Sequence, residues 1–83
     1  MKRKYIERMV VKIVEENCST VASAKDTLRD LKMTKDDIEC VCIDLKYLFG
    51  LDIHLHNKPI SENTTVKKII DMVWDNVNKE EDK

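Results

Sequence analysis

The sequence predicts a small all-α protein, and three observations support that prediction. The 83 residues include one Gly and one Pro, whereas an all-β fold needs many turn residues. Apolar residues recur at steps of three and four in three separate segments, which is the spacing of one helix face. Hydrophobic residues make up 42% and charged residues 37%, enough for one core inside well-solvated surfaces. We therefore expect residues 1–83 to form a single helical domain.

The first helix is expected to run from about Lys2 to about Asn17. Apolar residues at helical spacing form its buried stripe, and they are Ile6, Met9, Val10, Ile13 and Val14. The small and polar segment STVASAKDT then breaks this pattern. It is expected to be a connecting loop that Val21 and Leu28 anchor to the core.

The second helix has the clearest start and end in the sequence. Thr34 can act as its N-cap, and Asp36 and Asp37 place negative charge at the positive end of the helix dipole. Gly50 stands where a helix often needs a left-handed residue to end. The apolar face between these ends consists of Ile38, Val41, Cys42, Leu45, Leu48 and Phe49. After Gly50 we expect a loop with a short third helix or a single turn, because Pro59 prevents a long helix.

The last helix is expected to begin at Thr64 or Thr65 as its cap and to run to about Asn78. Its buried stripe consists of Val66, Ile69, Ile70, Val73 and Val77, with Trp74 at the edge. Residues 79–83 are polar and are expected to form a disordered tail.

Charge and cysteine content narrow the possible functions. Lys and Arg number 15 and Asp and Glu 16, for a net charge of −1, so no strong field attracts nucleic acid or an anionic membrane. Charged residues interrupt the opening segment too often for a signal peptide or a membrane span. The three cysteines lack Cys-x-x-Cys spacing, which favours reduced thiols. We expect a cytoplasmic protein that binds neither nucleic acid nor membrane.

Catalytic and metal-binding patterns are weak. His54 and His56 could hold a metal from an extended segment, but Asp52 and Glu62 are candidate third ligands only because they are near. We expect ordinary loop histidines and no metal site. No residue pattern pairs a nucleophile with a base, so we do not expect an enzyme.

Four segments occur in the order and spacing of a known family. They are YIERMVVKIVEEN, the pair Asp30-Leu31, the stretch from Leu45 to Phe49, and TTVKKIIDMV. Together they resemble the acyl carrier protein family, from about Ile6 to Val77. The resemblance implies a small acyl-carrier-like bundle of three main helices plus a short third helix or turn.

The family attaches 4′-phosphopantetheine to the serine of an Asp-Ser-Leu motif at the start of its second helix. Counting from the Asp-Leu pair and back from Leu45 puts Lys35 at this position, the attachment slot, with Thr34 and Asp36 beside it. An amine cannot form the phosphodiester, so we expect no cofactor, as in bacterial carrier-like families that lack the serine. One alternative is a functional acyl carrier protein of fatty-acid or polyketide-type synthesis modified at Thr34. Another is a structural component of a bacterial gene cluster.

A second apolar strip lies on the outer side of the second helix, where Cys40, Ile43 and Tyr47 recur at steps of three and four. The resemblance implies that carriers dock on their enzymes through this surface. We predict a partner-docking surface, the docking face, that consists of Asp36, Glu39, Cys40, Ile43, Asp44 and Tyr47. The alternative is that these are isolated exposed apolar residues, which are normal in proteins. We expect a monomer that binds a protein partner, in a docking or regulatory role.

Overall fold

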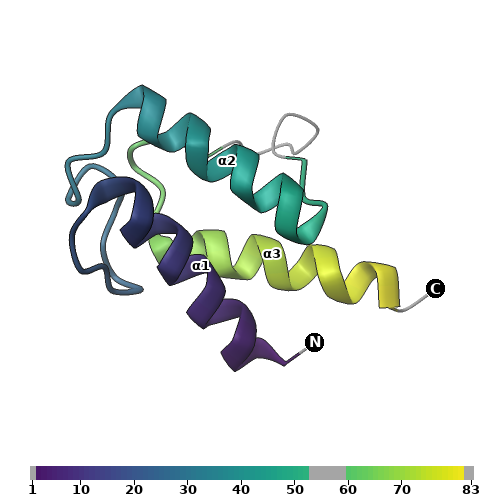
Figure 1. Ribbon diagram of the computed structural model, residues 1–83. Helices are drawn as coiled ribbons and strands as arrows, with labels where there is room; N and C mark the ends of the chain where they lie inside the picture. Colours follow the sequence, from purple (N-terminus) through teal and green to yellow (C-terminus); the bar gives the residue numbers. More distant parts are fainter. Residues whose placement is uncertain (1, 53–59, 82–83) are drawn as a thin grey trace.

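The structure is a computed structural model that describes residues 2–52 and 60–81. These residues form three α-helices, α1 (Arg3–Cys18), α2 (Lys35–Phe49) and α3 (Val66–Glu81). The first helix packs against both others, whereas α2 and α3 touch over a smaller area. In Figure 1, α2 lies above α3, α1 crosses α3, and the start of α1 and the end of α3 point to the same side. The all-α prediction is confirmed.

Local signals set the ends of α1 and α2. Ser19 ends α1 in the left-handed region at φ 57°, and its N–H donates to the Glu15 carbonyl at 2.8 Å. Thr34 and Asp37 form a reciprocal capping box at the start of α2, and Gly50 ends that helix at φ 68°. The bounds of both helices agree with the predicted ones to within about one residue.

The last helix begins at the predicted place and extends further than predicted. The Thr65 hydroxyl oxygen accepts a hydrogen bond from the Lys68 N–H at 3.1 Å, so Thr65 rather than Thr64 caps the helix. The helix ends at Glu81, whereas the sequence pattern indicated about Asn78. Lys and Glu are strong helix formers, and no Gly or Pro interrupts the last turn. The helix therefore includes residues that the sequence assigned to a polar tail.

The long loop between α1 and α2 supplies the other partners at the start of α3. The Val66 N–H donates to the Asp26 carbonyl at 2.9 Å, and the Lys67 N–H donates to the Ala24 carbonyl at 3.0 Å. Each helix start leaves backbone N–H groups without partners inside the helix. Here the backbone of a distant loop satisfies two of them.

The same loop is joined to the segment that precedes α3. The Leu28 N–H donates to the Thr64 carbonyl at 3.1 Å, and the Arg29 N–H donates to the Glu62 carbonyl at 2.8 Å. The side chains of Arg29 and Glu62 also form an ion pair at 2.6 Å. This attachment leaves Leu28 with no exposed surface, which confirms its predicted role as a core anchor.

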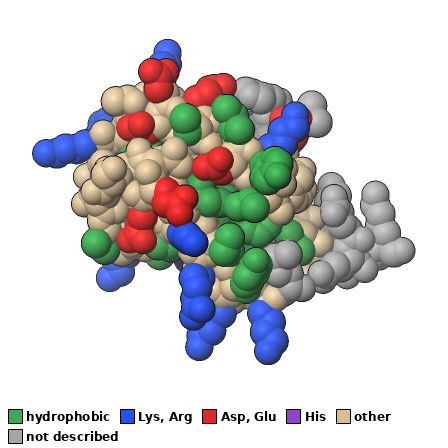
Figure 2. Space-filling view, in the orientation of Figure 1, with side chains coloured by type: hydrophobic (Ala, Val, Ile, Leu, Met, Phe, Trp, Pro, Cys, Tyr) green, Lys and Arg blue, Asp and Glu red, His purple; other side chains and the backbone are tan. Residues whose placement is uncertain are grey.

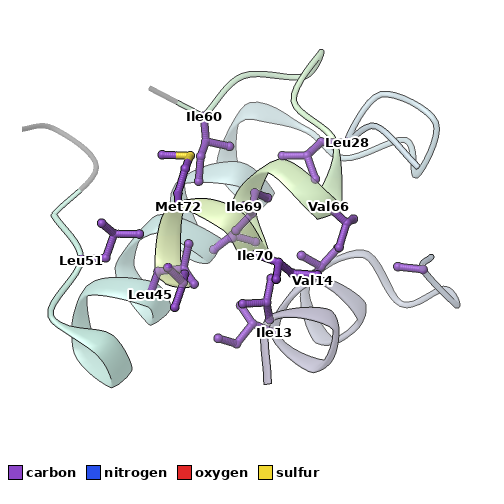
Figure 3. Close-up of a cluster of buried hydrophobic side chains, with 14 of the residues drawn as sticks. Ile13, Val14, Leu28, Leu45, Leu51, Ile60, Val66, Ile69, Ile70 and Met72 are labelled. Atoms are coloured by element: carbon purple, nitrogen blue, oxygen red, sulfur yellow. The ribbon is translucent and has the colours of Figure 1, made fainter. Parts of the chain in front are cut away.

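One apolar core joins the three helices and their connections (Figure 3). No polar or charged side chain of the described residues is buried in it. The buried residues are Ile6, Val10, Ile13, Val14, Ala22, Leu28, Leu31, Met33, Val41, Leu45, Leu51, Ile60, Val66, Ile69, Ile70, Met72 and Val73.

Four core assignments from the sequence need correction. Met9, assigned to the buried stripe of α1, is only half-buried and is not part of the core. Leu48, assigned to the buried face of α2, is 48% exposed because α1 diverges from the last turn of α2 (Figure 1). Val21, assigned as a second loop anchor, is 84% exposed. Met72 was absent from the predicted stripe of α3 but is buried, because Leu51 and Ile60 belong to the same core and widen the covered side of that helix.

The edge of α3 contacts the start of α1. Trp74 is half-buried, as its predicted edge position implies, and the Arg3 guanidinium carbon lies 5.7 Å from the centre of its ring. Arg3 also forms ion pairs with Asp71 and, at 3.5 Å, with Glu7. This cluster links the start of α1 to the partly exposed edge of α3.

The predicted short third helix falls largely outside the described residues. Leu51 and Asp52 follow α2 without helical structure, and residues 60–65 form a turn and an isolated bridge before α3. Residues 53–59 are not described, so the short helix stays a prediction.

Leu28→Ala tests the role of the loop, with Val21→Ala as a matched control on the same loop. Emptying a fully buried Leu site should lower the free energy of unfolding by about 2–5 kcal/mol. The control removes an exposed side chain, so it should change that free energy by no more than about 0.5 kcal/mol. Urea unfolding followed by Trp74 fluorescence measures both, and equal effects would contradict the loop's role in the core.

Candidate docking surface

The attachment slot lies at the first position of α2. Lys35 is the first residue of that helix, and its side chain is exposed. The Thr34 hydroxyl oxygen accepts a hydrogen bond from the Asp37 N–H at 3.2 Å, while the Thr34 N–H donates to the Asp37 carboxylate at 3.0 Å. Thr34 thus serves as the helix cap, and the exposed group at the slot is an amine.

A hollow of about 590 Å³ lies beside the slot. Its apolar lining comes from Met33, Ile38 and Ile60, and Lys35 and Glu39 of α2 stand among its polar residues. Ser61 and Glu62 line it from the segment before α3. An apolar lining with charged groups around it can accept an amphiphilic group.

The outer side of α2 is exposed as the sequence predicts. Cys40 is exposed, Ile43 is 60% exposed, and Tyr47 is 88% exposed. The carboxylates of Asp36 and Glu39 are also on exposed residues. Five of the six predicted docking-face residues therefore share one solvent-facing surface.

Asp44, the sixth residue, lies at the edge of this surface. It is half-buried, and one of its carboxylate oxygens accepts a hydrogen bond from the Asn17 side-chain amide of α1 at 3.3 Å. Leu48 adds exposed apolar surface near the end of α2. The sequence missed Leu48 because helical spacing alone placed it with the buried face.

The charged side chains of α2 differ in whether they form an ion pair. Lys46 forms one with Asp52 at 3.5 Å, so a carboxylate offsets the positive charge of one of the two lysines of the helix. The exposed carboxylates of Asp36 and Glu39 form no ion pair within residues 2–52 and 60–81. Figure 2 shows apolar and acidic side chains side by side in the upper part of this view, where α2 lies. The docking face thus combines apolar groups with exposed negative charge.

The Asp30-Leu31 pair has a structural role in the loop ahead of α2. The Thr27 N–H donates to the Asp30 carboxylate at 3.0 Å, and the Asp30 N–H donates to the Thr27 hydroxyl oxygen at 3.0 Å. These contacts with the Thr27 backbone and side chain hold the pKa of Asp30 below its ordinary value. Leu31 is buried in the core. The pair therefore shapes the turn that leads into the attachment slot.

Two cysteines on α2 occupy different environments. Burial raises the pKa of the Cys42 thiol, and the nearby Glu39 carboxylate raises it further. Cys40 lies on the exposed side of the helix, two residues away. All three cysteines are free.

The possible metal-binding and membrane-spanning segments can be examined only in the described part of the chain. His54 and His56 lie outside the described residues, and no cluster of potential metal ligands occurs in the described part of the chain. None of the helices in residues 2–52 and 60–81 is long and apolar enough to cross a membrane.

Comparisons with known proteins found no relative. The sequence matches no family model, and searches of the curated proteins and of the solved structures returned no match. The assignment of the candidate site therefore rests on the geometry of this chain alone.

Thiol labelling tests the two environments on α2. A maleimide reacts with the thiolate, so Cys40 should be labelled several times faster than Cys42, whose raised pKa leaves less thiolate at neutral pH. Peptide mapping by mass spectrometry gives the order of labelling. Cys40→Ser should remove the faster of these two sites and Cys42→Ser should leave it, whereas faster labelling of Cys42 would contradict the assigned exposure.

Proposed function

We propose that the chain is a protein-docking or regulatory module with acyl-carrier-like architecture that carries no 4′-phosphopantetheine. One observation carries the proposal: an exposed apolar strip flanked by exposed carboxylates lies on the same helix as a slot occupied by Lys35. Because the slot has no attachment hydroxyl, we expect the chain to function through the surface of α2, by binding a partner.

The character of the strip favours binding to a protein. Tyr side chains are enriched in protein interfaces because they combine a large apolar ring with a polar end. Tyr47 is almost fully exposed and lies near Ile43 on the same side of α2. Asp36 and Glu39 add negative charge beside them, so the best partner presents an apolar patch among Lys and Arg side chains.

The contacts at the slot argue against a prosthetic group. Lys35 offers an amine, which cannot replace the serine hydroxyl in a phosphodiester. The Thr34 hydroxyl oxygen already accepts the Asp37 N–H, and losing such a cap costs about 1 kcal/mol. Modification of Thr34 would disturb the start of α2.

A working acyl carrier is the second candidate, and the hollow beside Lys35 favours it. A carrier needs an apolar space near its attachment point, and Met33, Ile38 and Ile60 provide apolar lining there. This candidate requires attachment at Thr34, the hydroxyl next to the slot.

Ile43→Glu and Tyr47→Ala test the docking face. Both side chains are exposed, so the variants should keep the circular dichroism spectrum and unfolding midpoint of the wild type. Loss of the central apolar contact should abolish partner binding, measured by pull-down from the native host with quantitative mass spectrometry.

Val21→Glu is the matched control, because it places the same charge at an exposed apolar position outside α2. This control should retain every partner that wild type captures. Unfolding of Ile43→Glu, or equal capture by Ile43→Glu and wild type, would rule out the docking face.

The double variant Lys35→Ser with Asp36→Leu tests the slot. Co-expression with a promiscuous phosphopantetheinyl transferase should add one phosphopantetheine to the double variant and none to the wild type, as read by intact mass. Modification of the wild type, lost in Thr34→Val, would establish the working carrier instead. No modification of either chain would contradict the assigned register.

A further inference from the structure

We draw no further inference here: the strongest candidate, the hollow of about 590 Å³ beside Lys35, belongs to the site already described, and the opposite charges of Lys35, Glu39 and Glu62 in its lining select no class of ligand.

Discussion

The hydrogen bonds from the start of α3 to the long loop are the constraint on which the other contacts depend. Val66 and Lys67 donate their N–H groups to the carbonyls of Asp26 and Ala24. Leaving a buried backbone donor without a partner costs about 1–3 kcal/mol, so the loop backbone is held where those carbonyls meet the helix. Leu28 is then directed into the core, where it has no exposed surface.

This anchoring of the loop lets α2 be held by contacts on its inner side and at its ends. The loop delivers the buried Met33 directly before the Thr34 cap, and the Asn76 side-chain amide of α3 donates to the Phe49 carbonyl at the other end at 3.4 Å. Val41 and Leu45 fill the core between these points. The outer side of α2 therefore contributes little to stability, and its residues can change without loss of the fold.

The features that could be predicted from the sequence are those that depend on residues close to one another along the chain. Thr34 and Gly50 act within one turn of their helix, so their roles could be inferred from residue type and spacing. Leu48 was misassigned because its exposure depends on where α1 diverges. The loop carbonyls that cap the start of α3 could not be predicted from the sequence. Every residue has a backbone carbonyl, and only the fold determines which carbonyls meet the start of a helix. The docking face could be inferred from the outer side of α2, but the pairing of Lys46 with Asp52 could not.

The residue at the attachment slot is not explained by the stability of its helix. A cation in the first turn opposes the helix dipole, at a cost of about 0.3–1 kcal/mol, and Lys35 forms no ion pair within the described residues that would offset it. Asp37 already completes the capping box without it. Exchanging Lys35 for serine should therefore leave α2 at least as stable, because serine removes the unfavourable charge. Gain of a prosthetic group by such a variant would then report the chemistry of the slot rather than a change in folding.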